Sequence, residues 1–251
     1  MQTTIPDACA VPRALGKSGM RRSILIIKCG SADRAVSGKM GDYESWLIRA
    51  LGGDPAHFTV VYPAKGEALP EPSRCAAILT TGSAFAVTEH RPWMLSTGEY
   101  LIRAGEAGVP VLAVGFGHQL LGEMLGASVE KSPHGREFGT VEVSLSAEGQ
   151  RDPLFRSLPP VLKVYTSHEY VLASLPPGAT LLARNAHTEV QAFRHGDHLY
   201  GLQFNPELWL ELMRTLAEQR RLPAPALTEE VTAGRAIMKN FFDKYIAPRV
   251  D

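Results

Sequence analysis

Residues 111–121 read VLAVGFGHQLL, an apolar run followed by two glycines and then by apolar residues at helical spacing. The first part predicts a buried strand, and the second part predicts a helix with no polar loop before it. A strand that turns directly into a helix forms an elbow, whose tip residue is strained and exposes its side chain. The helix N-terminus supplies free N–H groups and positive potential, which suit a thiolate and an oxyanion. The residue at this tip is Gly115.

Strands and helices alternate on both sides of this elbow. Apolar runs typical of buried strands occupy residues 23–28, 57–63, 75–82 and 109–115, and helical patterns occupy 42–51, 92–107 and 117–126. Such alternation indicates a parallel sheet covered on both faces. Shorter, more alternating runs occupy residues 137–145, 161–175, 179–185, 188–195 and 198–204, and residues 229–247 predict a closing helix. The sequence therefore predicts an α/β fold, an open parallel sheet with an antiparallel β segment in the second half.

The length of 251 residues permits one large domain or two small ones. Residues 1–22 lack the apolar core of a signal peptide, and we expect them to form a poorly ordered extension. No internal repeat or low-complexity linker divides residues 23–251, so we expect a single domain there. No later segment approaches the ~18 apolar residues of a membrane span, which gives no reason to expect a membrane protein.

The charge balance and the cysteine count indicate which classes of partner and which cellular compartment to expect. The 26 basic residues balance 26 acidic residues, which gives no electrostatic reason to expect nucleic acid or a membrane surface as partner. The three cysteines, Cys9, Cys29 and Cys75, have no CxxC spacing. This pattern argues against a disulfide framework and a structural zinc site, and it favours a cytoplasmic protein.

The elbow resembles the G-x-C-x-G-H-Q-L-L motif of class I glutamine amidotransferases. Residues 117–121 match it, whereas Gly115 stands where that family has its catalytic cysteine. A second family signature, G-V-Q-F-H-P-E, is similar to GLQFNPE at residues 201–207, where Asn205 replaces the catalytic histidine and Glu207 remains. The resemblance extends from about Ile24 to Glu207. It implies a flavodoxin-like fold and a carboxylate, Glu207, in the position that would orient the histidine.

The same resemblance implies a ligand pocket. Residues 81–83, Thr-Gly-Ser, look like the loop that supplies part of the oxyanion hole, and residues 167–169, Ser-His-Glu, look like the segment that lines the glutamine pocket. Residues 137–139 resemble a strand entry of the family. The implied ligand-binding set is Gly82, Ser83, Gly115, Phe116, Gln119, Ser167, Glu169 and Asn205.

Glycine at position 115 and asparagine at position 205 determine whether glutaminase activity is expected. Glycine has no nucleophilic atom, and asparagine does not titrate near neutral pH, so it does not replace an imidazole as general base. Loss of one member of a nucleophile–base unit costs nearly as much as loss of the whole unit. We therefore predict that Gly115 and Asn205 do not support conventional glutaminase chemistry.

Cys29 ends the first predicted strand, at the sheet edge where open α/β folds bind ligands. Three interpretations stay open: a buried thiol that only packs, a relocated nucleophile with His168 or His118 as its base, and a metal ligand. A thiolate with an imidazole suits copper, zinc or iron, and the candidate set is Cys29, His168 and Glu169. No ligand spacing supports a transition metal, and the sequence leaves the cofactor unknown.

Three functions follow from these residues. The first is a repurposed enzyme acting on a small amino-acid-like or acyl compound, with Cys29, His168 and Glu207 as catalytic candidates. The second is a catalytically silent module that binds a small molecule and pairs with a synthetase or another biosynthetic enzyme. The third is an amide hydrolase with Cys29 as the relocated nucleophile.

Overall fold

The structure is a computed structural model that describes residues 22–52, 54–223, 227 and 229–250. The extension predicted over residues 1–22 lies outside the described residues, apart from Arg22. The strands are β1 (Ser23–Ile27), β2 (Phe58–Val61), β3 (Cys75–Thr80), β4 (Val111–Val114), β5 (Val129–Lys131), β6 (Glu137–Leu145), β7 (Val161–His168), β8 (Tyr170–Leu172), β9 (Ala179–Arg184), β10 (Ala192–His195) and β11 (Leu199–Leu202).

The α-helices are α1 (Arg34–Met40), α2 (Tyr43–Leu51), α3 (Pro92–Glu106), α4 (Phe116–Met124), α5 (Ala147–Arg151), α6 (Leu210–Arg220), α7 (Ala233–Phe241) and α8 (Ala247–Val250). A π-helical segment, Phe242–Ile246, joins α7 to α8. The predicted closing helix is therefore present, and it contains one change of helical pitch.

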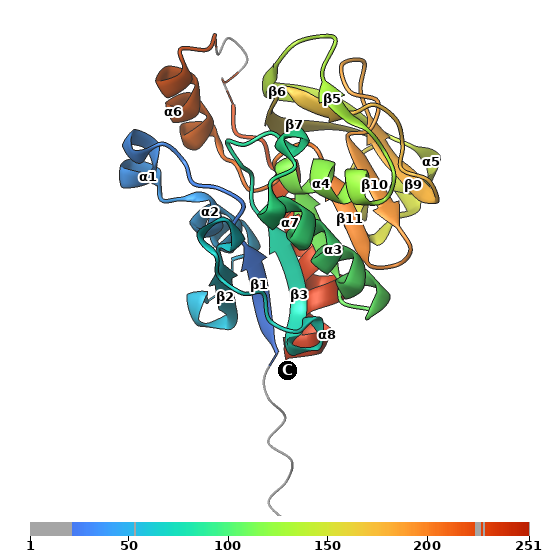
Figure 1. Ribbon diagram of the computed structural model, residues 1–251. Helices are drawn as coiled ribbons and strands as arrows, with labels where there is room; N and C mark the ends of the chain where they lie inside the picture. The colour runs from blue at the N-terminus through green and yellow to red at the C-terminus, as the bar shows by residue number, and fades with distance from the viewer. Residues whose placement is uncertain (1–21, 53, 224–226, 228, 251) are drawn as a thin grey trace, which may run out of the picture.

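The main sheet has the strand order β2-β1-β3-β4-β11-β10-β9-β6-β7 (Figure 1). Strands β2, β1, β3, β4 and β11 are parallel, which is the 2-1-3-4-5 order of flavodoxin-like sheets. From β11 onward the strands pair antiparallel, and the β10–β11 hairpin turns at Gly196 as the Gly-Asp pair predicts. The predicted flavodoxin-like α/β fold with an antiparallel second half is confirmed.

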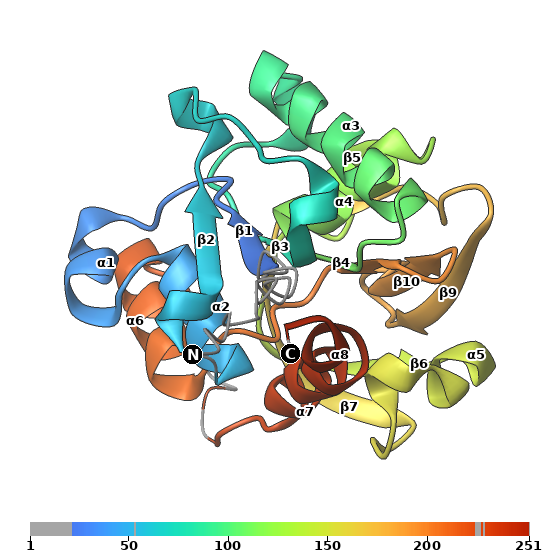
Figure 2. The same ribbon diagram turned by 90° about the horizontal axis from the view of Figure 1, so that it is seen from below.

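Helices cover both faces of the parallel strands. Figure 2 shows α3 and α4 on one side of the sheet and α2, α7 and α8 on the other. Side chains alternate between the two cores, since Ile24 and Ile26 pack toward α2 and α7 while Leu25 and Ile27 pack toward α3 and α4. This burial of both faces explains why the strands are continuous apolar runs. The prediction of one domain over 23–251 stays a prediction, and the continuous sheet supports it.

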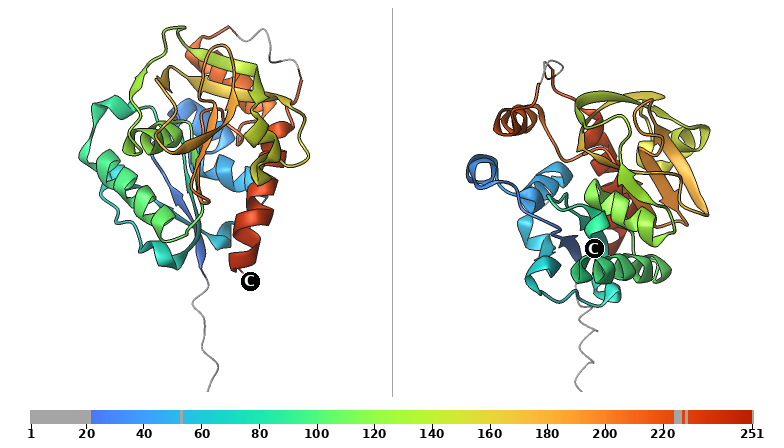
Figure 3. Two further views of the ribbon diagram at one scale, coloured as in Figure 1. Left: turned by 90° about the vertical axis from the view of Figure 1, so that its right-hand side faces the viewer. Right: turned by 45° about the horizontal axis from the view of Figure 1, so that its top comes forward.

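Two helices that the sequence pattern did not reveal, α1 and α6, contact each other beside the carboxyl ends of the parallel strands. Both views in Figure 3 show the α6 ribbon near the end of the sheet to which the parallel strands point. Strand β5 was not predicted either, and it pairs with β8 in a small separate sheet. Within the described ranges, no helix is long and apolar enough to cross a membrane.

Candidate functional site

A cavity of about 680 Å³ opens at the carboxyl ends of the parallel strands. Its lining comes from the segments that follow β1, β3, β4 and β11, together with β7 and the end of α6. This is the edge of an open α/β sheet at which ligands bind. All of the ligand-binding residues expected from the sequence line it: Gly82, Ser83, Gly115, Phe116, Gln119, Ser167, Glu169 and Asn205.

The elbow forms part of the lining of this cavity. Gly115 has φ 55° and ψ −105°, a conformation that strains residues other than glycine. Its N–H donates to the Leu202 carbonyl oxygen at 2.8 Å, which fixes the elbow to β11. Two residues later, a Cβ added to Gly117 would lie 1.7 Å from Oγ1 of Thr80. Glycine at 117 therefore allows α4 to begin directly against β3.

Asn205 and Glu207 lie beside the elbow. The Asn205 side-chain amide donates to Oε1 of Glu207 at 2.9 Å, and a Cβ added to Gly115 would lie 3.5 Å from the same amide nitrogen. Burial raises the pKa of Glu207 to about 7, against which the hydrogen bond from Asn205 acts only in part. Oε2 of Glu207 is buried without a hydrogen-bond partner among the described residues. The three positions that the resemblance singles out are thus brought together.

The loop after β3 is held by side-chain hydrogen bonds. Ser83 donates through Oγ to the Cys29 carbonyl oxygen at 2.9 Å and accepts from the Phe85 N–H at 3.0 Å. On the opposite wall, Gln119 donates to the Tyr170 carbonyl oxygen at 2.7 Å and to Oε1 of Gln203 at 3.2 Å. These bonds fix the positions of two polar side chains that line the cavity.

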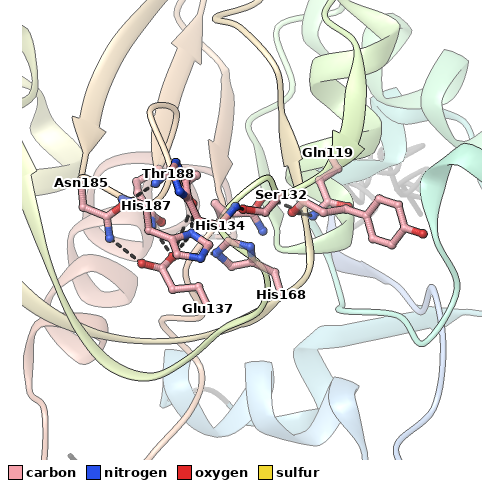
Figure 4. Close-up of polar contacts among 11 residues, drawn as sticks. Gln119, Ser132, His134, Glu137, His168, Asn185, His187 and Thr188 are labelled. Carbon is pink, nitrogen blue, oxygen red and sulfur yellow. Dashed lines mark hydrogen bonds and ion pairs between the residues drawn. The ribbon is translucent and has the colours of Figure 1, made fainter.

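His168 lines the cavity at the end of β7 and interacts with a buried carboxylate, Glu137 (Figure 4). The distance from Nε2 of His168 to Oε2 of Glu137 is 2.8 Å. Glu137 also accepts from the amides of Asn185 at 2.6 Å and Gln191 at 2.8 Å. Although burial alone would raise it, the pKa of Glu137 is lowered by its hydrogen bonds to His168 and Asn185. An ionised Glu137 accepts a hydrogen bond from Nε2 of His168, which fixes the orientation of the imidazole ring.

The rings of His134 and His187 lie next to this pair. His187 is 5.9 Å from the ring of His168 and 5.6 Å from that of His134. Figure 4 shows the three imidazoles gathered around Glu137, with Gln119 farther along the same wall. The carboxylate at the centre of the group is Glu137, the first residue of the strand-entry segment.

Cys29 does not line the cavity. Its side chain is fully buried, and Sγ lies 3.6 Å from the Ile27 carbonyl oxygen. Burial raises the pKa of the Cys29 thiol to about 12, which disfavours the thiolate that a nucleophile or metal ligand needs. Among the described residues, no group of three or more His, Cys, Asp and Glu side chains has a metal-binding arrangement. Cys29, His168 and Glu169 therefore do not form a three-ligand cluster.

His118, the other base considered for Cys29, is also buried away from the cavity. It packs on Phe193 with ring centroids 5.1 Å apart, and burial lowers its pKa to about 3. The cavity also contains polar residues that the sequence pattern did not reveal, among them Tyr43, Arg136 and Arg220. Arg220 lies at the end of α6, which the sequence pattern did not reveal, and spacing along the chain does not show which cavity a helix end faces.

A family model described as "Glutamine amidotransferase class-I" matches residues 57–219. The chain belongs to this family. A GMP synthase (glutamine-hydrolyzing) subunit from Thermococcus kodakarensis is 34% identical over 51% of this chain and 60% of its own length. The corresponding GMP synthase subunit from Sulfurisphaera tokodaii is 28% identical over 67% of this chain and 85% of its own length.

Some relatives of this glutamine amidotransferase-like chain are matched over only a small part of their length. The GMP synthase (glutamine-hydrolyzing) of Thermomicrobium roseum is 41% identical over 41% of this chain, a match that spans 19% of that protein. Among solved structures, a glutamine amidotransferase from Methylobacillus flagellatus matches with a TM-score of 0.73 and 18% identity, over 90% of this chain and 94% of the other. One from Thermotoga maritima has a TM-score of 0.71 and 21% identity, over 90% and 99%. These structural matches confirm the fold.

Proposed function

We propose that this class-I glutamine amidotransferase-like chain binds a small amino-acid-like compound in the cavity and does not hydrolyse it as a glutaminase. The observation that carries this proposal is the hydrogen bond from Asn205 to Glu207 beside a Gly115 that has no side chain. The carboxyl group that would orient a histidine here accepts from a non-titrating amide. The elbow offers its helix N-terminus to a ligand but no nucleophilic atom.

The retained polar lining supports a binding function. Gln119 and Ser83 are both held by hydrogen bonds to other elements, so their positions are fixed before a ligand arrives. Such preorganisation reduces the ordering cost of binding. The buried Cys29 thiol, whose pKa is raised to about 12, gives little support to an amide hydrolase with a relocated nucleophile.

A synthetase or another biosynthetic enzyme is the partner class that we propose. Relatives of this chain are named as GMP synthases or as GMP synthase subunits. A cavity that binds ligand without turnover would act on such a partner through occupancy, because a ligand shifts a conformational equilibrium by its differential affinity for the two states. The low cysteine count favours the cytoplasm as the place of this assembly.

One observation favours a second candidate, an enzyme of altered chemistry. Nε2 of His168 is paired with buried Glu137, and Nδ1 is itself buried and has no hydrogen-bond partner among the described residues. A carboxylate-oriented imidazole that lines a cavity is the arrangement of a general base. Under this alternative, His168 removes a proton from the bound compound, and Cys29 takes no part.

Isothermal titration calorimetry with L-glutamine and L-glutamate tests the binding proposal. Saturable binding is expected, and Gln119→Ala should weaken it about 2- to 10-fold because one or two neutral hydrogen bonds are lost. Gln150→Ala on the exposed surface of α5 is the matched control and should bind as the unaltered protein does. Failure of the unaltered protein to bind either compound would overturn the proposal. Consumption of a bound compound that His168→Ala abolishes would favour the second candidate.

A further inference from the structure

Arg220, the last residue of α6, is a half-buried cation that lines the cavity. Its Nη1 donates to Oγ of Ser167 at 2.6 Å, and the Tyr43 side chain lines the same cavity. Both of these side chains are uncharged. In the part of the chain that the structure describes, no carboxylate lies within ion-pair distance of this guanidinium.

A second arginine makes the charge imbalance larger. Arg136 forms an ion pair with Glu169 at 2.5 Å. This pair uses the one nearby carboxylate, so Arg220 is left without an ion-pair partner among the described residues. Both arginines line the same cavity, and burial is the main cause that lowers the pKa of Arg220, with Tyr43 and Glu169 acting against it. This end of the cavity therefore carries an excess of positive charge.

The other carboxylates of the cavity lining are engaged elsewhere. Asp33 accepts from the Ala35 N–H at 2.8 Å as the cap of α1. Glu89 pairs with Arg91 at 2.6 Å. Neither group forms an ion pair with Arg220, and a half-buried guanidinium that has no ion-pair partner of its own is costly unless a further acidic group neutralises it.

We propose that Arg220, together with Ser167 and Tyr43, binds an acidic group of the ligand, a carboxylate or a phosphate. The preferred ligand is then an amino-acid-like compound with a further acidic group, which binds more tightly than a neutral amide such as glutamine. This inference rests on the proposed binding function and specifies its ligand class. A guanidinium suits this task because its planar donors bind carboxylate and phosphate oxygens two at a time.

The size of the cavity agrees with such a ligand. About 680 Å³ falls within the roughly 300–1,000 Å³ of pockets that take drug-sized compounds. The lining extends from the elbow at Gly115 to the end of α6 at Arg220. A compound can therefore be longer than glutamine and still lie within one cavity.

The test compares two ligands that differ in one charge. γ-L-Glutamylglycine and its glycine amide are titrated calorimetrically into the full chain at pH 7.5. We expect the acid to bind about 10- to 100-fold more tightly than the amide, the range for a hydrogen-bonded charge pair. A third ligand, the phosphonate analogue γ-L-glutamyl-aminomethylphosphonate, distinguishes a carboxylate site from a phosphate site. Whichever of the carboxylate and the phosphonate binds more tightly identifies the acidic group that Arg220 prefers.

Arg220→Met should reduce the ratio of acid to amide affinity to near one. Arg184→Met, on the exposed part of β9 and outside the cavity lining, is the matched control and should keep the ratio. Equal binding of acid and amide to the unaltered protein, or a ratio that survives Arg220→Met, would overturn this inference and leave the binding proposal intact. Failure of L-glutamine and all three γ-glutamyl compounds to bind would overturn both.

Discussion

The side-chain amide of Asn205 donates a hydrogen bond of 2.9 Å to Glu207, directly beside the glycine at the tip of the elbow. Both residues are buried. The bond occupies one oxygen of a carboxyl group whose pKa is raised to about 7 by burial, and it leaves the other oxygen without a partner among the described residues. The first two predictions follow from this local arrangement.

Introducing the cysteine and the histidine of the family at positions 115 and 205 should create glutaminase activity. Among the described residues, a Cβ added to Gly115 comes within 4 Å of the Asn205 amide nitrogen alone, at 3.5 Å, which is ordinary van der Waals contact, so the elbow has room for the Cβ of Gly115→Cys. The positive φ at residue 115 should cost about 1–3 kcal/mol of stability. We expect the double variant to release ammonia from L-glutamine. Gly115→Ala with Asn205→His, the control, should release none. A folded double variant that binds L-glutamine but stays inactive would contradict this geometry.

Glu207 should make the protein less stable as the pH rises. Its pKa is about 7 in the folded state and near 4.5 in the unfolded chain, so the unfolded state binds fewer protons between these values. The free energy of unfolding should therefore fall across this window, by on the order of 2–3 kcal/mol at pH 8. In Glu207→Gln the amide oxygen can still accept from Asn205 and this loss is absent. Urea denaturation at pH 5 and pH 8 measures the difference. An equal effect of the substitution at both pH values would contradict the assignment.

Cys29 should be inert in the native protein. Its side chain is fully buried and the pKa of its thiol is raised to about 12. In a Cys9→Ala, Cys75→Ala background, the single remaining thiol should react with a chromogenic disulfide reagent only after unfolding in guanidinium chloride. Cys29→Ala should bind ligand within about twofold of the unaltered affinity. Rapid modification of the native thiol would revive the relocated-nucleophile hypothesis.

Gly117 should be needed for the close contact between α4 and β3. A Cβ there would lie 1.7 Å from Oγ1 of buried Thr80, so Gly117→Ala should destabilise the protein by about 1–3 kcal/mol through overpacking. Gly38→Ala is the control, because no atom of the described residues lies within 4 Å of its added Cβ and helix α1 should gain about 0.5–1 kcal/mol. Thermal unfolding of the two variants gives the comparison. Similar midpoints for both would contradict the close contact.

The parallel half of the fold was predictable from the sequence because its strands are buried on both faces and therefore appear as continuous apolar runs. The run over residues 161–175 was less informative. It forms two strands that separate at Glu169, whose carbonyl oxygen accepts from the Ser132 N–H at 2.8 Å. Strand β8 pairs with β5, and a pairing between segments this far apart leaves no periodic signal in either one.

The candidate site was predictable where a motif carried it. All the ligand-binding residues expected from the resemblance line one cavity, because motifs at the ends of parallel strands meet at one sheet edge. Cys29 lies two residues after the end of β1, but its side chain packs into the core between the sheet and α3. The direction of one side chain at a strand end depends on the pleat and the turn, which the motif does not contain. Arg220 was missed since its helix reaches the cavity only through tertiary packing.

The most direct test of the central claim is to measure binding and turnover of L-glutamine on the same sample. Saturable calorimetric binding should be followed by no release of ammonia above a protein-free control, over an incubation long enough for many turnovers of an ordinary enzyme. The Cys29→Ala variant should behave identically. Ammonia release by the unaltered protein that disappears in Cys29→Ala would contradict the account, because the nucleophile would then have moved rather than been lost.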